Sequence, residues 1–460
     1  MNHPDLDIVI LAAGKGTRMH SAQPKVLHQI GGKSMALRIT ETAETLNPRS
    51  ITIVAGHDKD ALMHELRGKN VQWAEQAEQL GTGHALQTAL PHLGADGRTL
   101  VLAGDVPLID TATLAGLLET AGNGVGLLTD LPDNPAGYGR IIRDRNGQVT
   151  AIVEEKDATI EQKALRETNT GIIVLPNRRL ADWLGSLKNS NAQGEYYLTD
   201  TVALAVRDGI PVHPLTVRAG HLAAGVNSKA QLAALERIFQ REQAENLMQA
   251  GLTLADPARF DLRGSLKHGQ DVFVDVGVVF EGENELGDKV SVGAHCVIRN
   301  AKIGSGTVIA PFSHLEGCTV GQDARIGPYA RLRSGAELDG GVHIGNFVEV
   351  KNSRIGQGSK ANHLSYIGDT EIGRHSNIGA GTITCNYDGV NKHRTHIGND
   401  VRIGSNTSLV APVRVEDRAT TGAGSVITRN CPEGKLTVAR ARQTVIEGWI
   451  RPEKDSKPET

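Results

Sequence analysis

The sequence predicts an α/β protein of two domains, in which a layered domain with a largely parallel sheet is followed by a parallel β-helix. Three observations lead to this prediction. At 460 residues the chain is too long for one ordinary hydrophobic core. Its first half alternates apolar runs with helix-length segments, whereas its second half repeats an aliphatic residue every six positions, often followed by glycine. The 53 glycines and the aromatic content of only 3% also suit a β-helix, whose narrow interior is filled by Val, Ile and Leu.

Five continuous apolar runs define the predicted sheet of the first half. They cover residues 6–11, 51–56, 99–105, 125–130 and 170–175. Runs of this kind, separated by helical stretches, are typical of buried and largely parallel strands. Ligands bind beyond the carboxyl ends of such strands. The segment LAAGKGTRM, which follows the first run, is therefore expected beside the Gly104-Asp105 turn that ends the third run.

A long amphipathic helix is predicted between the two halves. Residues 228–250 place Leu232, Leu235 and Phe239 on one stripe, with Ser228 as the N-cap and Gly251 as the C-terminal stop. We therefore expect three parts: a first domain over residues 1–227, a linker helix over 228–250 and a second domain over 251–460.

The six-residue phase runs from Val274 to Ile427. Three hexapeptides make one triangular coil, so this length predicts roughly eight to nine coils, with glycine at corners that need a positive φ. The phase breaks between Thr384 and Ile397, where the sequence reads CNYDGVNKHRTH. We expect a polar loop that leaves the β-helix there and serves as binding surface.

Composition and charge exclude several classes of protein. The net charge of -3, with 22% charged residues, lacks the basic excess that nucleic acids or anionic membranes attract. No apolar run approaches the roughly 18 residues of a membrane span. The four cysteines lie far apart (Cys296, Cys318, Cys385 and Cys431), so we expect reduced thiols and a soluble cytoplasmic protein. The charged tail over residues 451–460 is expected to be disordered.

The segment LAAGKGTRM has the features of a phosphate-binding turn. Gly14 and Gly16 let backbone N–H groups approach phosphates, and Arg18 and Lys25 add positive charge. Taken alone, these glycines fit a plain turn between strand and helix equally well. Met19 stands where a dinucleotide fingerprint needs its third glycine.

Further motifs accompany this turn: PK at 24–25, EQLGTGHA at 78–85, AGDVPL at 103–108, GYGR at 137–140, VEEKD at 153–157, TNTGI at 168–172 and GVN at 225–227. Together they resemble the nucleoside-diphosphate-sugar pyrophosphorylases, which implies a Rossmann-like nucleotidyltransferase domain that binds UTP. The resemblance assigns Arg18 and Lys25 to catalysis and Asp105 and Asn227 to Mg²⁺. Nucleotide and sugar contacts would come from Leu11, Ala12, Ala13, Gly14, Lys25, Gln76, Gly81, Thr82, Ala103, Gly104, Asp105, Gly139, Glu154, Asn169 and Asn227. Relatives often carry tyrosine at the position of Ala103. A nucleotide contact from that larger side chain is lost here, so only the main chain of Ala103 can contact the nucleotide.

The second half resembles the left-handed β-helix of the hexapeptide acyltransferases. Its segments RLRSG, VEVKNS, KANHLSYIGD and SNIGAGT, together with the polar loop, are similar to the glucosamine-1-phosphate N-acetyltransferases. By that resemblance His363 is the general base, a role that suits the pKa of about 6.5 of an ordinary imidazole. The acetyl acceptor would be held by Arg333, Lys351, Tyr366, Asn377 and Lys392. Acetyl-CoA would be held by Ala380, Asn386, Tyr387, Ser405, Ala423 and Arg440, and a homotrimer is implied.

The resemblance spans residues 8 to about 449 and covers both activities of one family, the UDP-N-acetylglucosamine pyrophosphorylase / glucosamine-1-phosphate N-acetyltransferases. It implies acetylation of glucosamine-1-phosphate by acetyl-CoA, followed by uridylyl transfer from UTP to N-acetylglucosamine-1-phosphate. The products would be pyrophosphate and UDP-N-acetylglucosamine for peptidoglycan and lipopolysaccharide precursors. Two alternatives stay open. In the first, the β-helix only regulates or oligomerises a pyrophosphorylase. In the second, the chain is a binding platform without activity.

Overall fold

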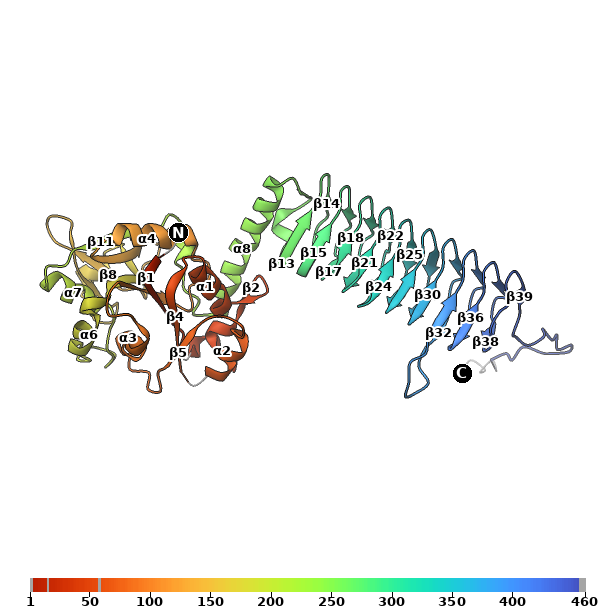
Figure 1. Cartoon of the computed structure of the whole chain (residues 1–460), viewed down its shortest axis with the longest axis horizontal. Helices are drawn as coiled ribbons and strands as arrows, with labels where there is room; N and C mark the ends of the chain where they lie inside the picture. Colours follow the sequence, from red (N-terminus) through yellow and green to blue (C-terminus); the bar gives the residue numbers. More distant parts are fainter. Residues whose placement is uncertain (1–2, 15, 57–58, 455–460) are drawn as a thin grey trace, which may run out of the picture. The chain divides into compact units, whose positions relative to one another are not determined.

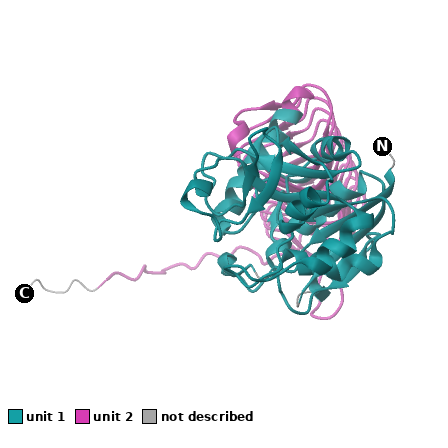
Figure 2. Cartoon of the chain, turned by 90° about the vertical axis from the view of Figure 1, so that its left-hand side faces the viewer, with its two compact units in different colours: residues 1–246, 262–264 teal, residues 247–261, 265–460 magenta. Residues whose placement is uncertain are grey.

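The computed structural model describes residues 3–14, 16–56 and 59–454 (Figure 1). Two compact units divide the chain: residues up to 246 with 262–264, and residues 247–261 with 265 onward (Figure 2). The division falls inside the helix between the two halves rather than at either of its ends. Most of the charged tail, residues 455–460, lies outside the described residues, as do residues 1–2. Within the described ranges no helix combines the length and apolarity that crossing a membrane requires.

The first unit is built on a sheet whose strand order is β11-β7-β10-β6-β1-β4-β5. These strands are β1 His3–Leu11, β4 Pro48–Ala55, β5 Gln72–Glu75, β6 Arg98–Ala103, β7 Val125–Asp130, β10 Thr168–Pro176 and β11 Val212–Thr216. The hairpin of β8 Arg140–Arg143 and β9 Val149–Val153 pairs with the start of β10. A separate small hairpin joins β2 Gln29–Ile30 and β3 Lys33–Ser34.

The prediction of a largely parallel sheet is confirmed, with β10 as the exception. This strand runs antiparallel to both of its neighbours, β6 and β7. The start of β10 consequently lies at the same edge of the sheet as the ends of β6 and β7. This reversal brings Asn169 to the edge where Asp105 follows β6.

Two layers of helices bury the two faces of this sheet (Figure 1). Alternate residues of β1 enter opposite cores, with Ile8 and Ile10 on one side and Val9 on the other. The helices are α1 Met35–Glu44, α2 Lys59–Glu65, α3 Thr82–Ala89, α4 Thr111–Ala121, α5 Ile160–Lys163, α6 Asn177–Ser186 and α7 Asp200–Arg207. Ile39 of α1 packs in the first core, and Trp183 of α6 packs in the second. The continuous apolar runs in the sequence follow from this burial on both faces.

The amphipathic helix of the sequence is α8, Lys229–Gln249. The hydroxyl of Ser228 accepts a hydrogen bond from the backbone N–H of Gln231 at 3.2 Å, as an N-cap does. Leu235 is buried in a cluster with Met19 and Ile30. Gly251, with a φ of 106°, follows the end of the helix.

The second unit is a parallel β-helix, which confirms the fold predicted from the six-residue period. One face carries β12 Thr253–Leu254, β14 Phe273–Val274, β16 Ser291–Val292, β19 Val308–Ile309, β22 Arg325–Ile326, β25 His343–Asn346, β28 Lys360–His363, β31 Asn377–Ile378, β34 Arg402–Ile403, β37 Thr420–Thr421 and β39 Leu436–Thr437. A second face begins with β13 Asp261–His268 and β15 Val279–Leu286 and continues with β17 Val297–Arg299, β20 His314–Glu316, β23 Arg331–Leu332, β26 Glu349–Lys351, β29 Tyr366–Gly368, β32 Ile383–Cys385, β35 Ser408–Val410 and β38 Val426–Ile427.

The third face carries β18 Lys302–Ile303, β21 Thr319–Val320, β24 Ala336–Leu338, β27 Ser353–Ile355, β30 Thr370–Ile372, β33 Thr395–Ile397 and β36 Val413–Val415. Each strand pairs with the equivalent strand of the next coil. Val292 pairs with Ile309, which pairs with Ile326, and all three are buried. The interior of the β-helix is therefore a set of aliphatic columns.

Glycines in the coils are of two kinds. The predicted positive φ is found at corner glycines such as Gly306 and Gly358, whereas Gly304 and Gly321, which follow aliphatic residues, do not have one. A Cβ atom on Gly304 would lie 2.6 Å from the backbone of Gly321 and Gln322, and one on Gly321 would lie 2.7 Å from the backbone of Asp339. The distance between successive coils therefore excludes a side chain at these positions.

A buried carboxylate in β1 accepts hydrogen bonds from several separate segments of the first unit. Asp7 of β1 is fully buried. It accepts hydrogen bonds from Arg49 Nη2 at 2.5 Å, Ser50 Oγ at 2.8 Å, the Gly94 backbone N–H at 2.9 Å and Asn177 Nδ2 at 2.9 Å. Burial would raise the pKa of Asp7, but these donors outweigh it and the pKa is lowered.

We predict that Asp7→Asn lowers the free energy of unfolding of the first unit by about 3 kcal/mol at pH 7, because an amide at this buried position cannot accept all of the hydrogen bonds that the carboxylate accepts from Arg49, Gly94 and Asn177. Because the folded pKa is lowered, the stabilisation is present above the unfolded pKa of about 3.9 and is lost as the pH falls through the folded pKa. Urea unfolding at pH 7 and pH 3 checks both points. Asp5→Asn, at an exposed position of the same strand, is the control. Equal stability of Asp7→Asn and wild type at pH 7 would contradict the prediction.

Candidate functional site

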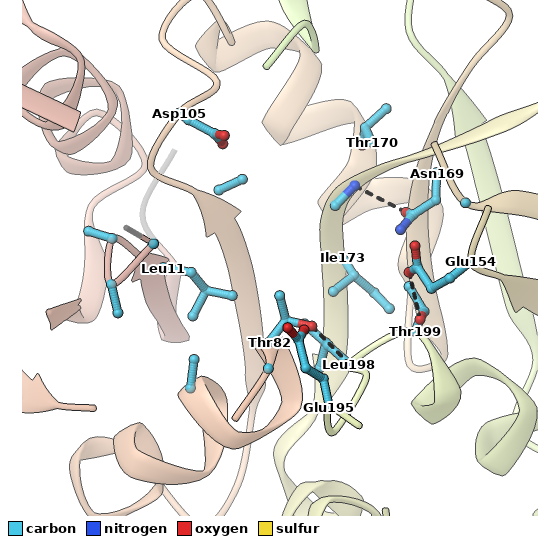
Figure 3. Close-up of a pocket in the computed structure, with 18 of the residues that line it drawn as sticks. Leu11, Thr82, Asp105, Glu154, Asn169, Thr170, Ile173, Glu195, Leu198 and Thr199 are labelled. Carbon is cyan, nitrogen blue, oxygen red and sulfur yellow. Dashed lines mark hydrogen bonds between the residues drawn. The ribbon is translucent and has the colours of Figure 1, made fainter. Parts of the chain in front are cut away.

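A cavity of about 550 Å³ opens at the carboxyl edge of the sheet in the first unit (Figure 3). It is lined by most of the residues predicted for this domain: Leu11, Ala12, Ala13, Gly14, Lys25, Gln76, Gly81, Thr82, Ala103, Asp105, Gly139, Glu154 and Asn169. In Figure 3 Leu11 and Asp105 lie on one side of the cavity, and Glu154 and Asn169 lie on the other. Motifs that are distant in the sequence thus surround one space.

Backbone pairing brings the predicted nucleotide turn and the Asp105 turn together. Leu11 at the end of β1 pairs with Ala103 at the end of β6, and the Gly104 N–H donates to the Leu11 carbonyl at 2.9 Å. A Cβ atom on Gly104 would lie 2.8 Å from that carbonyl oxygen. Gly104 itself does not line the cavity, and its contribution is this close approach of two strand ends.

Lys25, Asp105 and Asn227 form a charged cluster at one side of the cavity. Lys25 Nζ lies 2.5 Å from Asp105 Oδ2 and 3.2 Å from Asn227 Oδ1. The Val226 N–H also donates to the Asp105 carbonyl at 2.8 Å, which fixes the segment before Asn227. Asn227 does not line the cavity directly and joins it through Lys25.

The donor set of this cluster fits Mg²⁺. A carboxylate and an amide oxygen are hard ligands, and both lie within reach of the same ammonium, so one cation can contact both. Mg²⁺ keeps several waters and needs only one or two protein ligands. Among the described residues, no three His, Cys, Asp or Glu side chains form a group that could hold a metal ion.

Arg18 does not join the cavity. It is exposed on the short helix Thr17–Met19 and does not line the cavity walls. The left-handed conformations of Gly16 and His20 flank this short helix. The catalytic role of Arg18 remains a prediction.

Close packing shapes the wall that holds Gln76, Gly81 and Thr82. Gln76 is buried, and its side-chain N–H donates to the Gly81 carbonyl at 3.0 Å. Gly81 has a φ of 108°, and a Cβ atom there would lie 2.6 Å from the Tyr196 carbonyl oxygen. Thr82 Oγ1 accepts from the Leu198 N–H at 3.1 Å. Glycine at position 81 is thus required both by its conformation and by the neighbouring chain.

Glu154 lies in the most acidic part of the cavity. Burial raises the pKa of Glu154, a hydrogen bond from Thr199 Oγ1 at 3.0 Å acts against this, and the charges of Asp200, Asp157 and Glu195 raise the pKa further. The net shift is upward, so this carboxyl group takes a proton more readily than an exposed glutamate. It is placed to bond a hydroxyl group of a bound molecule.

Several lining residues were missed in the sequence. Gln79, Tyr138 and Thr170 lie within the quoted motifs, so these residues could have been predicted from those motifs. Glu195 and Thr199 come from the segment EYYLTD, for which we weighed no motif. Their participation depends on the packing of this segment against β9 and α3, which only the structure shows.

In the second unit three predicted cations act on one another: Arg333 directly after β23, Lys351 at the end of β26 and Lys392 in the loop over residues 386–394. Contact with the Lys392 side chain lowers the pKa of Lys351, and the charges of Lys392 and Arg333 act in the same direction. Arg333 Nη1 also donates to Glu349 Oε1 at 2.8 Å, and the Tyr366 backbone pairs with Glu349 on the next coil. Mutual repulsion of these cations favours a bound anion.

His363 lies at the end of β28, exposed to solvent. Its Nδ1 is 3.0 Å from Asn346 Oδ1 on the preceding coil. An amide oxygen only accepts, so Nδ1 carries the proton and Nε2 keeps a lone pair. Asn346 was missed in the sequence, because the contact joins two coils. Asn377 lies on the same face, one coil further on.

The residues predicted for acetyl-CoA form a column on successive coils beyond His363. The N–H of Asn406, next to Ser405, donates to the Ala380 carbonyl at 2.7 Å. The N–H of Gly424, next to Ala423, donates to the Ser405 carbonyl at 2.7 Å, and Arg440 Nη1 donates to the Ala423 carbonyl at 3.1 Å.

The loop over residues 386–394 carries the other predicted contacts, Asn386 and Tyr387. A cavity of about 610 Å³ in this unit is bordered by Arg354, Glu371 and His396 on another face. None of the predicted acetyl-site residues lines it. His363 and Tyr387, two of the predicted acetyl-site residues, are exposed on the single chain.

Two family models match the two halves. Residues 8–159 match the MobA-like NTP transferase domain. Residues 300–334 and 394–429 match the bacterial transferase hexapeptide of six repeats. The matched ranges contain the end of β1, all of β6 and Asp105 in the first unit and Arg333 with several coils in the second.

Full-length relatives agree with these matches. The bifunctional protein GlmU of Neisseria meningitidis serogroup C is 67% identical over 452 residues, which cover 98% of this chain and 99% of the relative. The proteins of that name from Chromobacterium violaceum and Bordetella parapertussis are 61% and 55% identical over 98% of this chain and at least 99% of each relative. With both halves and almost the whole length matched, the chain belongs to the family of the bifunctional GlmU proteins.

Proposed function

We propose that the chain makes UDP-N-acetylglucosamine in two transfers. The second unit acetylates glucosamine-1-phosphate with acetyl-CoA. The first unit then joins the N-acetylglucosamine-1-phosphate to the uridylyl group of UTP and releases pyrophosphate. The observation that carries the proposal is the single cavity around which residues from seven separate motifs converge, with Lys25, Asp105 and Asn227 at its side.

Uridylyl transfer requires charge neutralisation rather than proton transfer. A phosphate oxygen of the sugar phosphate attacks the α-phosphorus of UTP, and the bond to the pyrophosphate oxygen breaks. Asp105 and Asn227 would hold Mg²⁺, which neutralises phosphate charge. Lys25 donates to phosphate oxygens, and the turn at Leu11–Gly14 supplies backbone N–H groups. Glu154 and Asn169 bind hydroxyl groups of the sugar on the opposite wall, and Arg18 adds positive charge from outside the cavity.

Acetyl transfer requires a base. The 2-amino nitrogen of the sugar attacks the thioester carbonyl, His363 Nε2 takes a proton from that nitrogen, and CoA leaves as the thiol. Asn346 holds the imidazole in the tautomer that leaves Nε2 free. Arg333, Lys351 and Lys392 bind the phosphate, Tyr366 and Asn377 bind the sugar, and the column from Ala380 to Arg440 binds CoA together with Asn386 and Tyr387.

The assembly we propose is a homotrimer that acts in the cytoplasm on peptidoglycan and lipopolysaccharide precursors. Phe312, Tyr329 and Phe347 stack at 5.0 and 5.4 Å along one corner of the β-helix, and each is about half exposed. Exposed apolar columns of this kind are usually covered by a partner. The exposure of His363 and Tyr387 is also consistent with residues supplied by a neighbouring copy. Four unpaired cysteines suit a reducing compartment.

Removal of the Asp105 carboxylate should abolish only the first-unit reaction. We expect Asp105→Ala to lower Mg²⁺-dependent pyrophosphate release by at least about 100-fold, because the metal stabilises the transferring phosphate by several kcal/mol. Release of CoA thiol should stay within twofold of wild type. Asp182→Ala, at an exposed site on α6, is the control. Loss of both activities would contradict independent active sites.

Removal of the His363 imidazole should impair only the second-unit reaction. We expect His363→Ala to slow CoA thiol release with glucosamine-1-phosphate by about 100-fold or more, as for a general base. Pyrophosphate release should be unchanged. His268→Ala, at the end of β13, is the control. If the wild type releases no thiol, the chain is a pyrophosphorylase whose β-helix is a scaffold.

The homotrimer is checked by light scattering during size-exclusion chromatography. We expect a mass three times that of the chain at micromolar concentration. A monomer that retains acetyl transfer would show that a neighbouring copy is not needed.

A further inference from the structure

The loop over residues 386–394 leaves the β-helix at one defined corner. On every coil this corner joins the face of β29 and β32 to the face of β30 and β33. Thr370 of β30 pairs with Thr395 of β33, so the loop is inserted within a single coil. Figure 1 shows it extending away from the coils next to β32. The loop carries Asn386, Tyr387 and Lys392, all of which belong to the proposed acetyl site.

Hydrogen bonds within the loop shape it without attaching it to the coils. The Asp388 carboxylate accepts from the N–H groups of Val390 at 2.8 Å and Asn391 at 2.6 Å and bonds His393 Nε2 at 2.7 Å. The His393 N–H donates to the Asn386 carbonyl at 2.8 Å. At the end of the loop Arg394 Nη1 donates to Glu371 Oε1 of β30 at 3.4 Å. The place of Lys392 relative to the coils therefore depends on what holds the two ends of the loop.

One residue, Asp369, contacts both ends. Its carboxylate accepts a hydrogen bond from Asn386 Nδ2, where the chain leaves the coil. Its backbone carbonyl accepts from the Thr395 N–H at 3.2 Å, where the chain returns. Its own N–H donates to the Lys351 carbonyl at 3.1 Å. Asp369 thus connects the loop to the coil that carries Lys351.

A carboxylate is exceptional at this corner. The equivalent residues of the preceding coils are left-handed and uncharged: Gly282, Asn300, Gly317, Gly335 and Asn352. Asp369 has the same conformation, with a φ of 50°, and is 6% exposed. Its second oxygen accepts from Asn352 Nδ2 at 2.5 Å. Glycine or asparagine would satisfy the turn, so the turn alone does not account for a buried charge.

The charge also acts on the phosphate-binding cations. Contact with Lys392 lowers the pKa of Lys351, and the charge of Asp369 raises it. The charge of Asp369 thus acts against the repulsion that Lys351 meets from Lys392. Asp369 lies beneath the cations and is buried, so it does not occupy the surface that a sugar phosphate would contact.

We propose that Asp369 is the positioning residue of the acetyl-transfer site, which clamps both ends of the 386–394 loop so that Lys392 and Asn386 face Lys351. The proposal rests on the acetyl-transfer function proposed above. It predicts that Asp369 acts mainly on binding of the sugar phosphate, because His363 lies on β28 and is held by Asn346 instead.

Two substitutions test this inference with little backbone strain, since the same corner already carries their residues. Asp369→Asn keeps the shape and removes the charge, and Asp369→Gly removes the side chain. For both we expect the KM for glucosamine-1-phosphate to rise by about tenfold or more, with a smaller fall in kcat, since a misplaced charged contact weakens binding. Pyrophosphate release from UTP should stay within twofold of wild type. Asp339→Asn, at the exposed Asp339–Arg354 pair on another face, is the control.

Limited trypsin digestion tests the clamp without reference to activity. Lys392 and Arg394 are cleavage sites in the loop, and we expect faster cleavage there in both Asp369 variants than in wild type or Asp339→Asn. If the wild type has no acetyl-transfer activity but the variants are cleaved faster, the proposed function is wrong and the role of Asp369 in holding the loop is still supported. A KM within twofold of wild type in both variants, or unchanged cleavage in the loop, would overturn the inference.

Discussion

Hydrogen bonds between parallel strands position many of the candidate residues of this protein. In the first unit β1 lies between β4 and β6, so three strand ends meet at one edge and the turns after β1 and β6 touch. In the second unit each coil pairs with the next, so a residue at a given place in one coil stands over its equivalent in the next. Chemistry in both units is therefore built on positions that the backbone fixes before any side chain takes part.

The two units offer phosphates different surroundings. In the first unit small residues leave backbone N–H groups exposed to the cavity, and the Lys25 charge is balanced by Asp105. In the second unit Arg333 and Lys351 come from the coils and Lys392 from the loop, and the buried Asp369 carboxylate acts on Lys351. The first arrangement suits a nucleotide that arrives with its own metal ion. The second suits a small sugar phosphate that must be neutralised by protein alone.

Much of this could be predicted from the sequence because the determining patterns are local. The six-residue spacing of aliphatic residues predicted the coils of the β-helix. Its interruption between Thr384 and Ile397 predicted the loop. The apolar runs predicted the sheet, but nothing in the run 170–175 indicates that β10 is antiparallel, because strand direction depends on the hairpin that precedes it. The positive φ predicted for corner glycines is confirmed at Gly306 and Gly358. The different constraint on Gly304 and Gly321 was not predicted, because it comes from the next coil, which lies 17 or 18 residues away in the chain. Thr199, Asn346 and Asp369 were missed because each acts through a partner that is distant in sequence.

The corner from which the 386–394 loop departs has a consequence for how such a protein can diverge. Beyond the loop, Ile378 pairs with Ile403 and Ile397 with Val415, so the columns continue in register as if the extra residues were absent. Insertions or deletions at a corner thus leave the packing of the interior unchanged. Insertion or deletion of a single residue within a face would shift the register of every later coil. Selection can lengthen, shorten or replace such corner segments, and with them the molecules recognised, while the scaffold that orients them is inherited unchanged.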